Sequence, residues 1–124
     1  MKEETTLNRV IKFRAWTFHA ILEKHVMQSH EEISGNCLKF VTDNEAFKNR
    51  VIMQFTGLTD KNGKEIYEGD VIEYDGELMG NIVFNEGCFW TNGIDTIHAY
   101  EFDKSCYIIG NIYEHPHLLT PLAL

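Results

Sequence analysis

Two histidines near the C-terminus, His115 and His117, are the residues of this sequence that most resemble a pair of metal ligands. Imidazoles often bind zinc, but a zinc site needs three or four protein ligands that meet at one point. Pro116 stands between the two histidines, and the sequence around them supplies no third ligand. We therefore predict no metal site and no cofactor.

A second candidate is a group of carboxylates within eleven residues of chain: Asp60, Glu65, Glu68 and Asp70. Such a group resembles the oxygen ligands of Ca²⁺ or a pair of acids for proton transfer. Its spacing differs from that of a calcium-binding EF-hand loop, and Ile66 and Tyr67 interrupt it. We predict that these carboxylates accept backbone N–H groups in turns or are solvated at the surface.

A cysteine nucleophile with a histidine base is the remaining enzymatic possibility, built from His98 with Cys88 or Cys106. It requires a base and an orienting acid beside the thiol, and no glycine-rich turn surrounds either cysteine. The chain also lacks a phosphate-binding loop and a dinucleotide-binding motif. The sequence therefore predicts a protein that is not an enzyme.

The cysteines also indicate the compartment. The chain has three cysteines, Cys37, Cys88 and Cys106. Their odd number and wide spacing are unlike those of a disulfide framework or a zinc ribbon. This pattern is typical of reduced thiols in a cytoplasm. No apolar run is long enough to cross a membrane, and residues 1–6 lack the apolar core of a signal peptide. We expect a cytoplasmic protein of the host cell that does not engage a membrane.

The formal charge of the chain is −8. Because Lys and Arg supply most of the affinity for phosphates, this charge argues against duplex nucleic acid as a partner. An acidic protein can instead mimic nucleic acid, but Glu3-Glu4 and Glu31-Glu32 are the only adjacent acidic pairs. Mimicry of nucleic acid is therefore kept only as an alternative, and the charge more simply serves solubility.

The elements around the carboxylates follow from local chemistry. Residues 51–55 are apolar and β-branched like a strand, which Thr56-Gly57 is expected to end. Asn62-Gly63 predicts a tight hairpin turn, because such turns require positive φ angles. Gly69-Asp70 then predicts a corner that leads into a strand at 71–74.

Further strands are predicted on both sides of this stretch. They cover residues 10–16, 37–41, 81–85, 88–91, 97–102 and 106–113, the last broken at Gly110-Asn111 by a bulge or bend. Turns are predicted at 75–80, 86–87 and 92–93, and short helical turns at 42–47 and from Pro116. For residues 17–27, a short helix at 20–25 and a longer hairpin stay open, because short apolar runs do not distinguish them.

Short strands joined by tight turns predict a mainly β fold. Between residues 50 and 113 they form a small antiparallel barrel, since closing a sheet removes its exposed edges. We predict one domain at 10–119, with additional strands or a small lobe at 10–49 and the barrel at 50–119. Residues 1–9 and 120–124 are predicted to be flexible tails.

Three blocks of the sequence resemble the signature of the YopX family of phage and prophage proteins. They are IKFRAW at 11–16, QFTGLTDKNGKEIYEGDV at 54–71 and IGNIYEHP at 109–116. The family pattern has Tyr in place of Phe55, and Asn and Glu in place of His115 and His117. The resemblance implies an SH3-like roll, but it implies no activity, because the family has no established biochemistry. The family places a polar turn after Trp16, so we expect residues 17–27 to distinguish this member from its relatives.

These observations lead to a functional hypothesis, a phage or prophage accessory protein that acts by binding a host protein or a second copy of itself. The predicted contact residues are Asp60, Lys61, Asn62 and Lys64 in the turn, together with Trp90. Trp90 is included because Phe89 and Trp90 should point to opposite faces of a strand, which can expose one of them. The alternative is a homo-oligomeric structural component whose apolar residues 118–124 pack on a neighbouring subunit.

Overall fold

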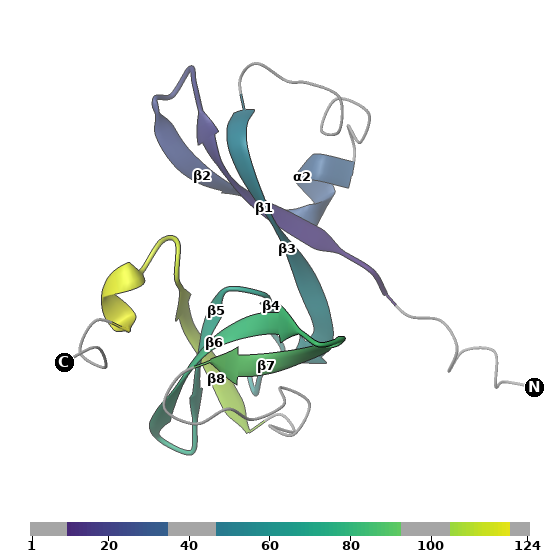
Figure 1. Ribbon diagram of the computed structural model, residues 1–124, viewed down its shortest axis with the longest axis vertical. Coiled ribbons are helices and arrows are strands. Elements are labelled where there is room, and N and C mark those ends of the chain that lie inside the picture. The colour runs from purple at the N-terminus through teal and green to yellow at the C-terminus, as the bar shows by residue number, and fades with distance from the viewer. Residues whose placement is uncertain (1–9, 35–46, 93–104, 120–124) are drawn as a thin grey trace, which may run out of the picture. The chain divides into compact units, whose positions relative to one another are not determined.

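The computed structural model describes residues 10–34, 47–92 and 105–119 (Figure 1). Its elements are β1 (Phe13–His19), β2 (Lys24–Gln28), α2 (His30–Ser34), β3 (Phe47–Thr59), β4 (Glu65–Tyr67), β5 (Asp70–Tyr74), β6 (Glu77–Asn85), β7 (Cys88–Asn92), β8 (Cys106–Asn111) and the 3₁₀-helix η2 (Pro116–Leu118). The strands form two four-stranded sheets, in the orders β2-β1-β3-β4 and β7-β6-β5-β8. Each strand pair is antiparallel, so the predicted mainly β class is confirmed. Neither helix of the described residues is long and apolar enough to cross a membrane.

The chain divides into two compact units, one of residues 12–54 and one of residues 1–11 and 55–124. The boundary lies within β3 and not between residues 49 and 50, where the sequence suggested it. The predicted end of this strand at Thr56-Gly57 is also wrong, because β3 continues to Thr59. Gly57 has a φ of 92°, and the pairing of β3 with β4 changes register between Phe55 and Thr59. A bulge thus replaces the expected end. The two predicted tails lie outside the described residues.

In the unit of residues 12–54, the structure decides between the two interpretations of 17–27. β1 and β2 form an antiparallel hairpin with His19 opposite Lys24, so the hairpin is confirmed and the helix at 20–25 is wrong. Pairing of aromatic and β-branched side chains across the strands outweighs the weak local preference for helix. The predicted strand at 10–16 starts later, at Phe13, and ends at His19.

A short helix, α2, follows this hairpin. Its start is a reciprocal cap, in which the Ser29 N–H donates to Glu32 Oε1 at 2.7 Å and the Glu32 N–H donates to Ser29 Oγ at 3.3 Å. Ile33 on this helix is buried, and so are Ala15 and Thr17 on β1, which have no exposed area. These buried side chains form the interior of this unit.

In the unit that contains residues 55–119, the sheet β7-β6-β5-β8 is curled into a half-barrel (Figure 1). The SH3-like class of roll predicted from the sequence is therefore confirmed at the level of a curled antiparallel half-barrel. Its core consists of buried apolar residues from four strands, namely Ile66, Ile72, Met79, Ile82 and Cys106, against which Leu58, Tyr74, Phe89 and Ile108 pack. Burying such side chains is the main stabilising term for a domain of this size.

Two-residue turns join β5 to β6 and β6 to β7. Asp75 and Gly76 have φ angles of 53° and 83°, and Glu86 and Gly87 have 52° and 79°. Two successive positive φ angles match the right-handed twist of paired strands. The predicted turn at 86–87 is confirmed, but the predicted turn at 75–80 is shorter than expected because β6 already begins at Glu77.

The last strand, β8, contains the predicted irregularity. Val71 pairs with Gly110 and Ile72 pairs with Ile108, so Ile109 is an extra residue in β8 and forms a bulge. Pro116 is the first residue of η2, also as predicted. Phe47 belongs to β3, and the other residues of the predicted helical turn at 42–47 lie outside the described residues, as do the predicted strands at 37–41 and 97–102.

Candidate functional site

The turn between β3 and β4 is organised by the side chain of Asp60, which is only 3% exposed. Its Oδ1 accepts the N–H groups of Asn62 and Lys64, both at 2.9 Å. Its Oδ2 accepts the N–H of Ile108 on β8 at 3.0 Å. The prediction that Asp60 belongs to a contact surface is wrong, because its carboxylate is buried and accepts backbone N–H groups of the protein itself.

Backbone hydrogen bonds hold the same turn. Asp60 N–H donates to Lys64 O at 2.8 Å, and Lys61 N–H donates to Cys106 O at 2.9 Å, so the turn is attached to the beginning of β8. The side chains of Lys61, Asn62 and Lys64 are exposed. Lys61 Nζ lies 6.0 Å from the centroid of the Tyr107 ring. Three of the four predicted contact residues of this turn are therefore accessible on a fixed backbone.

Two other carboxylates of this stretch, those of Glu65 and Asp70, also act locally. Asp70 is 2% exposed, and its Oδ2 accepts the Tyr67 N–H at 2.8 Å. Glu65 Oε1 accepts the hydroxyl of Tyr67 at 3.3 Å. Capping of turns is thus confirmed for Asp60 and Asp70. Within the ranges that the structure describes, no three His, Cys, Asp or Glu side chains are placed to share a metal ion.

The thiol of Cys106 lies in the core, 1% exposed. Burial raises its pKa above the usual value, and the nearby carboxylate of Asp60 adds to this effect. A nucleophilic cysteine needs the opposite shift, because the thiolate is the reactive form. His98, the proposed base, lies outside the described residues.

This environment leads to a prediction about thiol reactivity. At pH 8 in the folded protein, iodoacetamide should modify Cys88, which is half-buried, at least about tenfold faster than Cys106. The raised pKa leaves less thiolate at Cys106, and burial also blocks access to it. Mass spectrometry of tryptic peptides taken over time measures both rates. Equal rates in the folded protein, with the same ratio in urea, would contradict this assignment of the two sites.

The two C-terminal histidines belong to the turn that follows β8. His115 Nδ1 accepts the Asn111 N–H at 3.2 Å, and the ring centroids of His115 and His117 are 6.1 Å apart. Asn111 also binds this turn through its side chain, whose Oδ1 accepts the N–H groups of Tyr113 and Glu114 at 3.0 and 2.8 Å. His115 therefore has a structural contact that occupies one of its two ring nitrogens.

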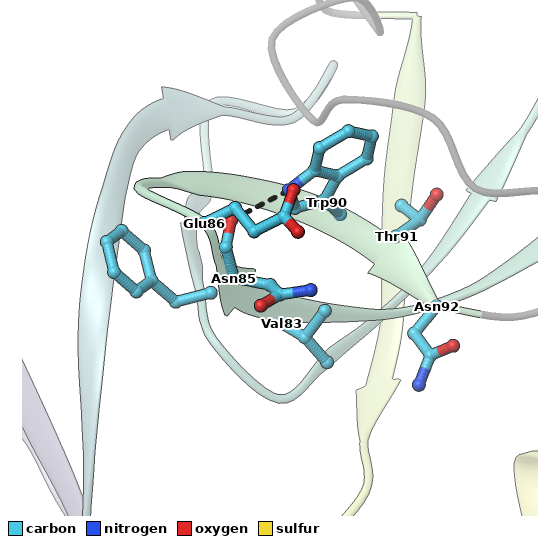
Figure 2. A pocket seen from close by; sticks show the side chains of 7 residues that line it. Val83, Asn85, Glu86, Trp90, Thr91 and Asn92 are labelled. Carbon is cyan, nitrogen blue, oxygen red and sulfur yellow. Dashed lines mark hydrogen bonds between the residues drawn. The ribbon is translucent and has the colours of Figure 1, made fainter.

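Trp90 lies on β7, at the edge of its sheet opposite β8. Phe89 packs against the core, so its neighbour on the strand, Trp90, points to the other face, as predicted. Trp90 lines a hollow at the β6–β7 hairpin, where its indole N–H donates to the backbone oxygen of Asn85 (Figure 2). Because the turn around Asp60 is bound to β8, the structure places Trp90 and that turn at opposite edges of the sheet. They do not form one surface.

A further exposed feature is the tip of the β1–β2 hairpin, which lies in the segment 17–27 that the sequence marked as distinctive but not as a contact site. Ile21 is 78% exposed and Leu22 is 55% exposed. The backbone beneath them is held by His19, whose carbonyl accepts the Glu23 N–H at 2.7 Å and whose Nδ1 accepts the Leu22 N–H at 3.2 Å. The only signal in the sequence is the apolar Ile21-Leu22 pair in a segment without Gly, Pro or Asn.

Comparison with known proteins agrees with this fold. The family model described as "YopX protein" matches residues 4–120. No curated protein matches the chain. Among solved structures, the crystal structure of protein EF1440 from Enterococcus faecalis is similar, with a TM-score of 0.53 and 22% sequence identity over 90% of this chain and 99% of that one. At this identity the similarity shows a shared fold.

Proposed function

Because the chain belongs to the YopX protein family, we propose that it is a phage or prophage accessory protein without enzymatic activity that works by binding another protein. Its described carboxylates with the least exposure, Asp60 and Asp70, are occupied by backbone N–H groups. The Cys106 thiol is buried with a raised pKa. These residues serve the fold.

The observation that carries the proposal is the exposed apolar tip of the β1–β2 hairpin. Two large aliphatic side chains in water gain roughly 1.5–3 kcal/mol each when they are fully buried in a partner. The turn that bears Ile21 and Leu22 is fixed by His19, so little backbone entropy is lost on binding. A projecting apolar tip on a fixed hairpin is well suited to fill a pocket on another protein.

The test compares the wild type with the double variant Ile21→Ser/Leu22→Ser. Each protein is immobilised and exposed to a lysate of the host cell, and bound proteins are quantified by mass spectrometry. We expect the variant to lose at least one wild-type partner, with affinity for the purified partner reduced by about thirtyfold or more, equivalent to about 2 kcal/mol.

A matched control is Ile109→Ser, which removes an apolar side chain that is 39% exposed on β8. This control should retain the partner. If the double variant captures the same proteins at the same affinity as the wild type, the tip is not the contact site. Light scattering on the purified proteins tests the alternative of a homo-oligomer, since a defined oligomer that the double variant reduces to monomers would identify a second copy as the partner.

A further inference from the structure

The turn that joins β3 to β4 contains an exposed Asn-Gly pair, Asn62-Gly63, one of the two such pairs in the sequence. Asparagine is a thermolabile residue, because the backbone nitrogen of the next residue can attack its side-chain carbon. A following glycine has no Cβ to hinder this approach. The turn thus contains a side chain that can react with its own backbone, and no part of the proposed function uses it.

Hydrogen bonds and φ angles identify the type of this turn. The Gly63 N–H donates to Asp60 O at 2.9 Å, which closes a β-turn from Asp60 to Gly63. Lys61 and Asn62 are not among the described residues with positive φ, so types II, I′ and II′ are excluded and type I fits. Gly63 then has a φ of 83°, as in three-residue hairpin loops that end in a glycine bulge.

A type I turn keeps the Gly63 nitrogen away from the carbon that it would attack. The attack closes a ring through Cα, Cβ and Cγ of Asn62, so the Gly63 nitrogen must rotate until it lies beside Asn62 Cβ. In a type I turn the third residue has a ψ of about 0°, which places that nitrogen beside the Asn62 nitrogen instead. Its N–H is also occupied by Asp60 O. The turn must therefore open before the reaction begins.

Asp60 opposes this opening. Its Oδ1 accepts the N–H groups of Asn62 and Lys64, both at 2.9 Å, and its backbone N–H donates to Lys64 O at 2.8 Å. Rotation at Asn62 moves both Gly63 and Lys64, so it breaks their bonds to Asp60. The other carboxylate oxygen of Asp60 is held by the Ile108 N–H at 3.0 Å, which fixes the acceptor in place. The resting turn is thus the unreactive one.

We propose that Asn62 is a site of spontaneous deamidation and that Asp60 keeps it latent in the folded chain. The Gly63 nitrogen loses its proton and bonds to Asn62 Cγ, the bond from Cγ to the amide nitrogen breaks, and ammonia leaves a succinimide ring. Water then adds to one of the two ring carbonyls that flank the nitrogen and opens the ring. One product is aspartate. The other is isoaspartate, whose main chain is one methylene longer, and no oxidant, reductant or enzyme takes part.

Isoaspartate at this position should detach the turn from β8. The extra methylene lies between the two N–H groups that Asp60 Oδ1 accepts, those of Asn62 and Lys64, so both can no longer reach one oxygen. Loss of these bonds frees the carboxylate that holds Ile108. We expect the Ile108 amide to exchange its hydrogen faster in the isoaspartate form than in the unmodified chain. The modified chain is separated from the unmodified one by its additional negative charge on an ion exchanger.

The test incubates the full chain in H₂¹⁸O at mildly alkaline pH, folded and in guanidinium chloride, and analyses acidic pepsin digests by mass spectrometry. Incorporated ¹⁸O marks conversion during the incubation, and electron-transfer fragmentation distinguishes isoaspartate from aspartate. We expect Asn62 to convert at least about tenfold more slowly in the folded chain, because tenfold corresponds to about 1.4 kcal/mol, the size of one hydrogen bond. The second pair, Asn92-Gly93, serves as the reference for the unfolded chain.

Variants assign the latency to Asp60. Asp60→Ala should raise the rate at Asn62 in the folded chain at least about fivefold and leave the rate in guanidinium chloride unchanged. Asp60→Asn, which keeps one acceptor oxygen, should give an intermediate rate and replaces the alanine variant if that one does not fold. Ile82→Val removes a methyl group from the core of the same unit and should leave the rate at Asn62 unchanged. Circular dichroism shows which variants are folded.

Three results would overturn the proposal: equal rates at Asn62 in the folded and unfolded chain, an unchanged rate in the folded Asp60 variants, or no conversion of Asn62 even in guanidinium chloride. None of these measurements involves the tip of the β1–β2 hairpin. Failure of the tip to bind a protein and failure of Asn62 to deamidate are therefore separate results.

Discussion

Replacing Asp60 by alanine is expected to lower the free energy of unfolding by about 3 kcal/mol. The carboxylate accepts three backbone N–H groups, from Asn62, Lys64 and Ile108, and alanine leaves all three without this acceptor. A donor that loses its partner in a partly buried place costs roughly 1–3 kcal/mol, less where water can replace the partner. Urea unfolding followed by circular dichroism measures the difference.

Two further variants make the Asp60 experiment specific. Asp60→Asn keeps one acceptor oxygen but turns an NH₂ group toward a backbone N–H, so it should also be destabilising, by more than about 1 kcal/mol. Glu77→Ala removes an exposed carboxylate elsewhere in the same unit and should change stability by less than about 0.5 kcal/mol. In Asp60→Ala the amide of Ile108 should exchange its hydrogen faster. A cost below about 1 kcal/mol for the alanine variant would show that the carboxylate does not hold the turn to β8.

Replacing Gly110 by alanine is the second large change, with an expected loss of about 2 kcal/mol. A Cβ at this position would lie 2.6 Å from Leu118 Cδ1 and 2.8 Å from His115 Nδ1. Both the Leu118 side chain and the His115 ring must move. The end of the Leu118 side chain can turn away, but the His115 ring is held by its hydrogen bond to the Asn111 N–H, and overpacking of this kind typically costs about 1–3 kcal/mol. The shift also weakens the hydrogen bond from the Asn111 N–H to His115 Nδ1. Thermal and urea unfolding measure the loss.

A double-mutant cycle separates crowding from other effects of the Gly110 substitution. Leu118→Ala removes the nearer of the two contacts, so the alanine at 110 should cost less in that background than in the wild type, by about 1 kcal/mol. Gly76→Ala serves as the control for a glycine without crowding, since no atom lies within 4 Å of its added Cβ and only its φ of 83° opposes the change. Additive effects at 110 and 118 would mean that the close approach of η2 to β8 is not the cause.

The parts of the fold that the sequence predicted are those fixed by neighbouring residues. Asn62-Gly63 predicted the hairpin because only a few residue types adopt positive φ cheaply, and Gly63 does so with a φ of 83°. The break near Gly110 and the start of η2 at Pro116 follow from the same kind of local restriction. The capping role of Asp60 was also visible, because an aspartate two residues before a turn amide is a common acceptor.

The features that were missed depend on partners far along the chain. Nothing near Asp60 indicates that its second oxygen accepts the N–H of Ile108, 48 residues away. The turn at Ile21-Leu22 contains no turn-forming residue, and it exists because β1 and β2 pair and the His19 side chain supports it. Alternation showed that Phe89 and Trp90 differ in orientation, but which of two aromatic residues faces the core is decided by the packing of Ile82 and its neighbours.

The position of the boundary between the two units inside β3 has a practical consequence for dissecting the protein. β3 pairs with β1 through residues such as Ile52 and with β4 through Phe55 and Thr59, so one uninterrupted strand supplies hydrogen bonds to both units. The pairs with β1 all lie at residues 47–54 and the pairs with β4 at residues 55–59, so a cut after residue 54 would keep both sets of pairs but would divide a strand instead of a linker. Chimaeras that exchange one unit should therefore take residues 47–59 from a single parent, so that the strand shared by the two units stays intact.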